Sequence, residues 1–264
     1  MKKYLVVGNP IEHSLSPKLH NFWIKNNNID AIYEKKKIKD DEIFHLISQL
    51  REKKIHGINV TVPFKKTVIP FLDYLSHESE NTQSVNTIYL KNNKIIGHNT
   101  DIEGFERSIR ESNLETSNKK VLILGAGGVV PSIIFALIKM KVSKITISNR
   151  TKNNAEKLKD LFQNLEIVDW GEVPESDIII NATSIGLKKE DEINLDFSKI
   201  GKNKLFYDVI YKPSETNFLK NAKKLGNRTE NGKLMFIYQA LAAFKKWHEI
   251  EPNIDREVFK LLNE

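Results

Sequence analysis

The segment Gly125-Ala126-Gly127-Gly128 has the residue types and the position of a phosphate-binding turn. It follows an apolar stretch that predicts a strand and precedes one that predicts a helix. In that position the first two glycines allow a tight turn, and backbone amides can approach a pyrophosphate at the helix N-terminus. The third glycine position of the dinucleotide-binding fingerprint holds Val130 instead. We predict dinucleotide binding here, with a purely structural turn as the alternative.

The residues after the next predicted strand bear on which coenzyme would bind. Enzymes that use NAD usually carry Asp or Glu there, about 20 residues further on, to bind the ribose hydroxyls. This chain has Ser148-Asn149-Arg150-Thr151, which offers no carboxylate to repel a 2′-phosphate and a guanidinium that can bind one. The pattern favours NADP. The alternative is that Arg150 is a surface residue and that Thr151 only caps the following helix.

A loop near the start of the chain presents two hydroxyl groups. Ser14 and Ser16 lie two residues apart in GNPIEHSLSP at 8–17, which follows a predicted strand and precedes a predicted helix. Such a loop suits a polyhydroxylated or carboxylate ligand. The alternative is that Ser16 only caps the helix and that Ser14 only belongs to a turn.

Further polar residues stand near the ends of predicted strands in the first hundred residues. The segment NVTVPFK at 59–65 places Asn59 and Thr61 on one strand face and Lys65 at a strand-to-helix junction. Asn86 and Asp101 also stand at strand ends, where ligand sites in α/β sheets usually form. Considered by itself, Lys65 is predicted to be a surface lysine.

The composition excludes several other chemistries. The 264 residues contain no cysteine, which removes disulfides, thiolate metal sites, iron–sulfur clusters and cysteine nucleophiles. The seven histidines are dispersed and show no ligand spacing, so we predict no metal site. An apolar fraction of 40% is enough to fill cores, which excludes disorder for the bulk of the chain.

The charge pattern indicates neither a nucleic-acid partner nor a membrane span. Lysine and arginine outnumber acidic residues by 41 to 34, but the lysines are scattered among acids, which is typical of a solvated surface and compatible with an anionic substrate. Residues 121–138 are uncharged, yet their glycines and Pro131 divide them into a strand, a turn and a helix. The short apolar stretch at the N-terminus is no signal peptide, so we expect a cytoplasmic protein.

Hydrophobic periodicity predicts a mixed sheet in the first hundred residues. Helices are expected to begin at Ser16-Pro17 and at Asp40-Asp41, and another to span Phe64–Leu72. The stretch Lys91–Lys94 predicts a hairpin turn, which makes the sheet mixed rather than purely parallel. Strands are predicted at Tyr4–Val7, Ala31–Lys36, Gly57–Val62, Val85–Leu90 and Lys94–Gly97.

From residue 101 onward strands and helices alternate. Strands such as VLIL at 121–124 and IIIN at 178–181 are near-continuously apolar, as expected for parallel strands covered by helices on both faces. Strands are predicted at Lys120–Leu124, Lys144–Ser148, Ile167–Val168, Asp177–Asn181 and Lys204–Val209, and helices at about 101–112, 131–140, 153–163, 214–225, 232–247 and 255–263. The fold class is therefore α/β, with a doubly wound, Rossmann-like dinucleotide-binding domain after the mixed-sheet domain.

Taken together in chain order, these motifs closely resemble those of the shikimate dehydrogenase family. The resemblance implies reversible, NADPH-dependent reduction of 3-dehydroshikimate to shikimate, a step of chorismate and aromatic amino acid biosynthesis. The matching segments are GNPIEHSLSPKLHN at 8–21, NVTVPFK at 59–65, SVNT at 84–87, GHNTDIEG at 97–104, GAGG at 125–128, NRT at 149–151, NATSIG at 181–186, DVIYKP from 208 followed by Thr216, and NGKLMFIYQ at 231–239.

The resemblance also implies that the substrate and the coenzyme are bound by different domains. A substrate domain would cover residues 1–100 and be completed by 238–264, an NADP-binding domain would cover 101–237, and the active site would lie in the cleft between them. Lys65 would be the acid/base at the reacting oxygen, with Asp101 beside it and Tyr211 facing the substrate. An ammonium suits that role, because reduction of a ketone leaves negative charge on its oxygen that a proton donor can neutralise.

The remaining implied roles concern binding. The substrate's carboxylate and hydroxyls would be held by Ser14, Ser16, Asn59, Thr61, Asn86, Asp101 and Gln239. The coenzyme would be held by Gly125, Ala126, Gly127, Gly128, Asn149, Arg150 and Thr151, with Thr183, Ser184, Gly186 and Gly232 near its nicotinamide end.

Several positions depart from the family pattern. Asn154 stands where many relatives have an arginine that helps to hold the 2′-phosphate, so selectivity for NADP is expected to be weaker than Arg150 alone suggests. Val130 and Pro131 alter the start of the nucleotide-binding helix, and Phe236 replaces a commoner leucine.

Two alternative functions stay open at this point. One is a quinate/shikimate dehydrogenase that uses NAD, and the other is a non-catalytic NADP-binding regulatory module. The presence of both Lys65 and Asp101 argues against the second. In either enzyme reading the partner is a small molecule, and the protein is expected to be a monomer or a homodimer.

Overall fold

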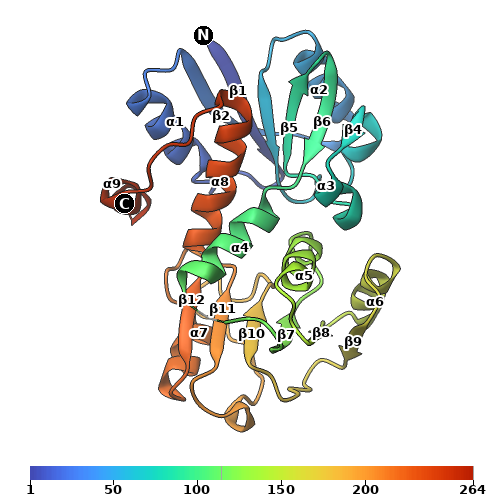
Figure 1. Cartoon of the computed structure of the whole chain (residues 1–264), viewed down its shortest axis with the longest axis vertical. Helices are drawn as coiled ribbons and strands as arrows, with labels where there is room; N and C mark the ends of the chain where they lie inside the picture. Colours follow the sequence, from blue (N-terminus) through green and yellow to red (C-terminus); the bar gives the residue numbers. More distant parts are fainter. Residues whose placement is uncertain (114, 264) are drawn as a thin grey trace. The chain divides into compact units, whose positions relative to one another are not determined.

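The computed structural model describes residues 1–113 and 115–263, and the chain divides into two compact units. Unit 1 comprises Met1–Asp101 and the residues from Ile237 onward, and unit 2 comprises Ile102–Phe236. The predicted domain boundaries lie after residues 100 and 237. Unit 1 is therefore built from two separate stretches of chain, whereas unit 2 is continuous (Figure 1).

Unit 1 contains a six-stranded mixed sheet with the strand order β2-β1-β3-β5-β6-β4. Strand β1 is parallel to β2 and β3, whereas β5 is antiparallel to β3 and β6. Asn92 and Asn93 form the β5–β6 turn with φ values of 50° and 60°, the left-handed conformation that a two-residue hairpin turn requires. The predicted mixed sheet is confirmed. The strands are β1 (Lys2–Gly8), β2 (Ala31–Lys37), β3 (Gly57–Val60), β4 (Tyr74–Leu75), β5 (Thr87–Lys91) and β6 (Lys94–His98).

Helices cover the sheet of unit 1 because successive strand residues point to opposite faces. Leu5 and Val7 of β1 belong to an aliphatic core with the buried residues of α2, whereas Tyr4 contacts the rings of Trp247 and His248 on α8. The helices are α1 (Ser16–Asn26), α2 (Ile43–Arg51), α3 (His77–Thr82), α8 (Lys233–His248), which begins in unit 2, and α9 (Arg256–Asn263), with 3-10 turns at Asp40–Glu42 and Ile69–Phe71.

Unit 2 contains a six-stranded sheet with the order β12-β11-β10-β7-β8-β9, in which every neighbouring pair is parallel. Counted along the unit, this is the 3-2-1-4-5-6 order of the doubly wound dinucleotide-binding fold. The strands are β7 (Lys120–Leu124), β8 (Lys144–Ser148), β9 (Leu165–Val168), β10 (Ile178–Asn181), β11 (Leu205–Asp208) and β12 (Arg228–Asn231); the helices are α4 (Asp101–Glu111), α5 (Val130–Lys139), α6 (Lys152–Glu156) and α7 (Asn217–Lys224), with 3-10 turns at Lys157–Asp160 and Ser198–Ile200.

Several elements differ from the sequence prediction. The predicted helix Phe64–Leu72 is a series of turns that ends in a 3-10 turn at Ile69–Phe71. Phe64 and Val68 are buried at helical spacing, but Pro70 lies within the predicted range and cannot donate the backbone hydrogen bond of a regular helix. The predicted helix 153–163 ends at Glu156 and continues as a 3-10 turn. Strands β4 and β12 and helix α3 were not predicted.

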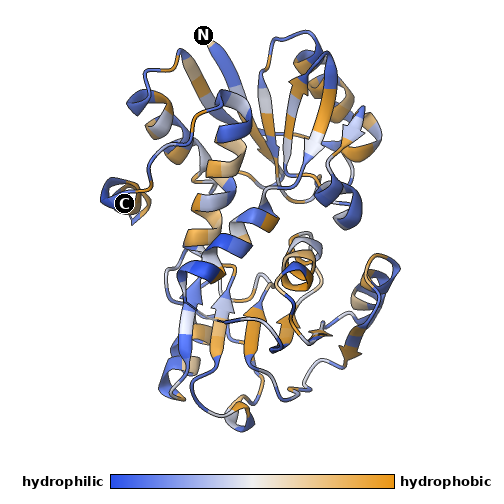
Figure 2. Cartoon of the chain, viewed as in Figure 1, coloured by the Kyte–Doolittle hydropathy of each residue, from blue (hydrophilic) through white to orange (hydrophobic). Residues whose placement is uncertain are grey.

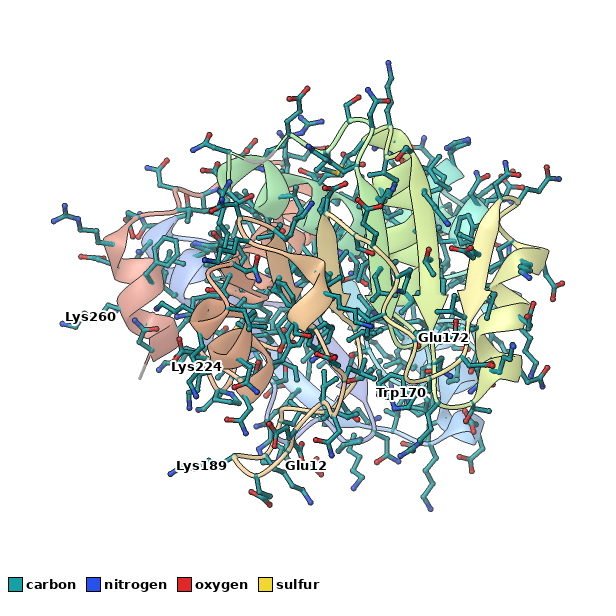
Figure 3. All side chains as sticks on the ribbon, turned by 90° about the horizontal axis from the view of Figure 1, so that it is seen from below. Glu12, Trp170, Glu172, Lys189, Lys224 and Lys260 are labelled. Carbon is teal, nitrogen blue, oxygen red and sulfur yellow. The ribbon has the colours of Figure 1, made fainter. Side chains whose placement is uncertain are left out.

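The uncharged stretch 121–138 has the predicted division, with β7, the glycine turn and α5 in succession. Among the residues that the structure describes, no helix is long and apolar enough to cross a membrane. Charged side chains point away from the ribbon in Figure 3, where Lys224 and Lys260 are examples. Many lysines form exposed ion pairs with acids, such as Lys120 with Glu175 at 2.7 Å, which contribute little to stability.

Candidate active site

The polar residues singled out in unit 1 come together at one edge of its sheet. Strands β1, β3 and β6 end at this edge and β5, which is antiparallel to β3 and β6, begins there. Asn59, Thr87 and His98 are therefore register partners in one row. The loops that leave this row carry the predicted site residues, so their shared position follows from the strand directions.

Lys65 and Asp101 form a largely buried ion pair at this edge. The Lys65 Nζ lies 2.5 Å from the Asp101 Oδ2, and the two side chains are 13% and 9% exposed. The interpretation of Lys65 as a surface lysine is therefore wrong. The pair is 36 residues apart in sequence, and each partner lies on a segment that follows a different strand.

Asn86 fixes the carboxylate of this pair. Its Nδ2 donates to the Asp101 Oδ1 at 2.8 Å, which leaves Oδ2 for Lys65. Its Oδ1 accepts from the Thr100 amide at 2.8 Å and from the hydroxyls of Thr87 and Thr100 at 3.0 and 3.1 Å. Because all of these groups are buried, the amide of Asn86 has one orientation and Asp101 is held in place.

Asn59 lies beside this group with three of its polar positions already used. Its Nδ2 donates to the Asn86 carbonyl and to the Thr87 Oγ1, both at 3.0 Å, and its Oδ1 accepts from the Tyr33 hydroxyl at 2.7 Å. Asn59 is 6% exposed, at the rim of the site. Both amide hydrogens serve the protein, so what Asn59 can offer a ligand is an acceptor lone pair on Oδ1.

Ser14, Ser16 and Thr61 lie on the loops that leave β1 and β3. Helix α1 begins at Ser16, its N-cap is Leu15, and no side chain caps it. The alternative in which Ser16 only caps the helix is therefore wrong, which leaves its hydroxyl available for other contacts. The Ser14 Oγ accepts from the Ser16 amide at 3.3 Å, and the Thr61 amide donates to the Val7 carbonyl at 2.9 Å. Gln239 is half-buried on α8.

The glycine turn of unit 2 follows β7 at the carboxyl edge of the parallel sheet. Gly125 has φ +109°, and an added Cβ would lie 2.9 Å from the Ala182 carbonyl oxygen, so only glycine fits there. Around Gly127 and Gly128, by contrast, no atom lies within 4 Å of an added Cβ. The turn therefore leaves open space beside the N-terminus of the ten-residue helix α5, which fits a coenzyme pyrophosphate.

The segment after β8 is exposed, as a contact with the far end of a coenzyme requires. Arg150 is exposed, and the Asn149 Nδ2 donates to the Thr151 carbonyl at 2.8 Å, which closes a small turn. Thr151 occupies the N-cap position of α6, but its side chain makes no capping hydrogen bond. The alternative in which Thr151 only caps the helix is therefore not supported, because its hydroxyl accepts no hydrogen bond from the first turn of α6.

A buried carboxylate organises the loops after β10 and β11. The Asp208 Oδ1 accepts from the Asn181 Nδ2 at 3.1 Å and from the Ile210 amide at 3.0 Å, and its Oδ2 accepts from the Thr216 hydroxyl at 2.6 Å. Burial raises the pKa of Asp208, and these hydrogen bonds oppose the rise. The Asn181 Oδ1 in turn accepts from the Thr183 amide and hydroxyl at 3.1 and 2.7 Å, so Asp208 fixes Thr183 indirectly.

Tyr211 and Gly232 lie on the loops that follow β11 and β12. The Tyr211 ring stacks on Phe236 with centroids 4.7 Å apart and planes at 24°. An added Cβ on Gly232 would lie 2.1 Å from the Val209 carbonyl oxygen, so glycine permits close packing of these two loops. Ser184 is exposed and Gly186 is buried, with its amide donating to Asp191 at 3.1 Å.

Some residues that shape the site were not predicted from the sequence. They are Tyr33, Thr87, Thr100, Asn181 and Asp208, each of which holds a predicted site residue in place. Four of them lie inside the motifs given above, so their places in those motifs could have identified them as site residues: Thr87, Thr100, Asn181 and Asp208. Within residues 1–113 and 115–263, no group of three or more histidine or acidic residues could hold a metal ion.

The sheet order and the open glycine turn define a two-unit α/β protein with a dinucleotide-binding fold. Residues 6–88 match the family described as shikimate dehydrogenase substrate binding domain, and residues 108–200 match shikimate / quinate 5-dehydrogenase. The chain is 61% identical over 262 residues to a Pelagibacter ubique (strain HTCC1062) protein named shikimate dehydrogenase (NADP(+)), with 99% of each chain covered. The chain belongs to the shikimate dehydrogenase family, which confirms the resemblance and the predicted fold class.

Solved structures agree with this assignment. A Listeria monocytogenes shikimate 5-dehydrogenase in complex with shikimate and NAD has a TM-score of 0.91 and 30% identity, with 99% of this chain and 96% of that chain covered. A Thermus thermophilus shikimate 5-dehydrogenase in complex with NADP(H) and shikimate has a TM-score of 0.87 and 28% identity, with 96% and 95% covered.

Proposed function

We propose that this chain catalyses the reversible, NADPH-dependent reduction of 3-dehydroshikimate to shikimate. The observation that carries the proposal is the buried Lys65–Asp101 pair, locked by Asn86 at a sheet edge that also presents Asn59 and Ser16. Membership of the shikimate dehydrogenase family supports the same reaction. The expectation of a cytoplasmic monomer or homodimer stays a prediction.

The substrate would be held by residues of unit 1. Asn59 would accept a hydrogen bond from a substrate hydroxyl, since both of its amide hydrogens serve the protein. The full proposed set is Ser14, Ser16, Asn59, Thr61, Lys65, Asn86, Asp101 and Gln239, together with Tyr211 of unit 2.

The coenzyme would be held by residues of unit 2. The open turn at Gly127 and Gly128 fits its pyrophosphate, and Arg150 would bind its 2′-phosphate. The full proposed set is Gly125, Ala126, Gly127, Gly128, Asn149, Arg150, Thr151, Thr183, Ser184, Gly186 and Gly232. When bound, NADPH supplies the hydride that reduces the ketone carbon.

Lys65 would provide the proton for this reaction. As negative charge grows on the ketone oxygen, the Lys65 ammonium neutralises it by donating a proton, and in the oxidative direction the resulting amine takes the hydroxyl proton back. Asp101 orients the ammonium through its Oδ2, and Asn86 keeps the other carboxylate oxygen occupied. Preorganised in this way, the ammonium needs no rearrangement at the moment of reaction.

A steady-state matrix of shikimate and quinate against NADP and NAD tests the proposal. We expect the specificity constant to be highest for shikimate with NADP. A maximum for quinate with NAD would assign the chain to the quinate-oxidising alternative. Absence of turnover with all four pairs, together with tight NADP binding, would assign it to a non-catalytic regulatory module.

A further inference from the structure

Tyr33 is a buried tyrosine whose backbone, ring and hydroxyl are all fixed. Its amide donates to the Asn21 Oδ1 at 2.9 Å, and its carbonyl accepts from the Asn21 Nδ2 at 2.8 Å. Its ring lies flat on the His20 imidazole, with centroids 4.2 Å apart and planes at 3°. With 1% of its surface exposed, Tyr33 has no freedom to choose another rotamer.

The ring of His20 acts here as a flat packing surface. His20 is 1% exposed, and neither ring nitrogen has a hydrogen-bond partner among the residues that the structure describes. Burial lowers the pKa of His20 to about 3, so the imidazole is neutral at physiological pH. Tyr33 is thus held by stacking against an uncharged ring.

The Tyr33 hydroxyl reaches one residue of the proposed substrate set. It donates to the Asn59 Oδ1 at 2.7 Å, and both side chains are buried. Tyr33 lies on β2 and Asn59 on β3, and these two strands flank β1, so the hydrogen bond joins residues on opposite sides of β1.

This connection decides what Asn59 presents to a ligand. The Tyr33 hydroxyl requires an oxygen opposite it, and the Asn86 carbonyl and Thr87 hydroxyl accept from the amide nitrogen on the other side. Asn59 therefore has one amide orientation, with Oδ1 toward Tyr33 and its second lone pair left for a ligand. Without the Tyr33 hydroxyl, the Asn59 Oδ1 would lose a hydrogen-bond donor at a position that is almost shielded from water.

We propose that Tyr33 is a positioning residue for substrate recognition, which fixes Asn59 as a hydrogen-bond acceptor without itself touching the substrate. The inference rests on the proposed function, because Asn59 is a substrate ligand only in that reading. It predicts that the Tyr33 oxygen affects shikimate binding and leaves the coenzyme unaffected.

Tyr33→Phe tests this inference, because it removes one oxygen and keeps the stacked ring. We expect the KM for shikimate to rise about 3- to 10-fold, in line with one lost buried hydrogen bond. The KM for NADP and kcat should stay within about 2-fold of their wild-type values. Tyr207→Phe is the matched control, since Tyr207 is a 1% exposed tyrosine of unit 2 whose hydroxyl shares a hydrogen bond with the Ser108 hydroxyl at 3.0 Å. This change should leave every kinetic parameter unchanged.

A double-mutant comparison separates positioning from general packing. In an Asn59→Ala background, the effect of Tyr33→Phe on the shikimate KM should shrink to less than half of its size in the wild-type background, because the group that Tyr33 positions is then missing. Equal effects in the two backgrounds would overturn the inference. So would an unchanged shikimate KM in Tyr33→Phe, or an equal rise in the KM values of both substrates.

Two further measurements keep the test decisive. Thermal melts establish that each variant is folded at the assay temperature. If Tyr33→Phe is not, Asn21→Ala replaces it, because this change keeps the phenol and removes both hydrogen bonds to its backbone. A folded Asn21→Ala with an unchanged shikimate KM would overturn the inference.

The failure of this inference can be distinguished from the failure of the proposed function. If the wild-type protein does not oxidise shikimate, the proposed function fails and this inference fails with it. If the wild-type protein oxidises shikimate and the variants behave like it, only this inference fails.

Discussion

In the Lys65–Asp101 pair, each oxygen of the Asp101 carboxylate has a different partner. The carboxylate has one oxygen on Asn86 and one on Lys65, so the ammonium keeps its remaining hydrogens for a ligand. A lysine held this way differs from its neighbour Lys66, which is exposed. The difference makes the two lysines a natural pair for testing the acid/base role.

Lys65→Ala should lower kcat by roughly 10²–10⁴-fold, the usual range for a positioned proton-transfer group. The KM for shikimate should change little, because the group acts on charge that develops only during the reaction. Steady-state kinetics at saturating shikimate give both numbers. Lys66→Ala is the control and should behave like wild type. Near-normal turnover of a folded Lys65→Ala would remove Lys65 from the mechanism.

Arg150 carries the proposed preference for NADP. A charge-assisted hydrogen bond contributes about 1.5–3 kcal/mol, so Arg150→Asp should lower kcat/KM for NADP by about 10- to 100-fold or more and affect NAD much less. Lys157→Asp makes the same charge change at an exposed position further along and should have little effect. Equal losses for NADP and NAD would contradict the 2′-phosphate assignment.

The residues of the proposed substrate set were easier to predict than the residues that hold them in place. Asn59, Asn86 and Asp101 could be placed because strand ends in α/β sheets meet at one edge. Tyr33 could not be placed in the same way, since its segment AIYEKKK only predicts a strand. Its hydroxyl reaches Asn59 because β2 and β3 flank β1, and that strand order is not encoded in local periodicity. The alternative that made Ser16 a helix cap fails because α1 begins one residue earlier than a Ser16 cap would require, with Leu15 at the N-cap position.

At the scale of elements, periodicity predicted strands best where burial is complete on both faces. Strands β7 and β8 match the prediction residue for residue, and in both of them every residue after the first is buried. Strand β12, with the sequence RTEN, carries no such signal, and Figure 2 shows it in hydrophilic colours beside the apolar centre of the sheet. It is a strand because β11 pairs with it in register, which is a tertiary effect.

In the glycine turn between β7 and α5, Gly125 is required by the backbone, whereas Gly127 leaves space for a ligand. One substitution at each position should separate these two roles. Gly125→Ala should lower the free energy of unfolding by about 1–3 kcal/mol, because its φ of +109° and the Ala182 carbonyl exclude a side chain. Gly127→Ala should leave stability near that of wild type but weaken NADP binding, since its Cβ would occupy the open space above the turn. Urea unfolding and titration of coenzyme fluorescence measure the two effects. A stable Gly125→Ala, or a Gly127→Ala with normal NADP affinity, would contradict this division.

At the scale of the whole molecule, three histidines of unit 1 should make the free energy of unfolding depend on pH. Burial lowers the pKa of His20 to about 3 and the pKa values of His98 and His248 to about 4. The unfolded chain therefore binds more protons than the folded chain between these values and about pH 6.5. Stability should be fully present above pH 6.5 and should fall as the pH decreases toward 4.

His20→Phe tests this dependence, because phenylalanine keeps a flat ring against Tyr33 and cannot be protonated. Between pH 7 and pH 5 wild type should lose about 2 kcal/mol more stability than the variant, as expected for 1.5 pH units below the unfolded pKa. Urea unfolding followed by tryptophan fluorescence gives the difference. His13→Gln, at an exposed histidine, should retain the wild-type dependence. Parallel pH profiles of wild type and His20→Phe would show that His20 is protonated in the folded state.

The division of unit 1 into two stretches of chain has a consequence for synthesis on the ribosome. The rings of His20 and Trp23 pack against Phe244, which is made only after all of unit 2. At about 5–20 residues per second that interval is roughly 7–27 s. When this interval ends, unit 2 has been synthesised in full, whereas His20 and Trp23 still lack Phe244. Unit 2 is therefore the part that can fold first, and unit 1 is finished last.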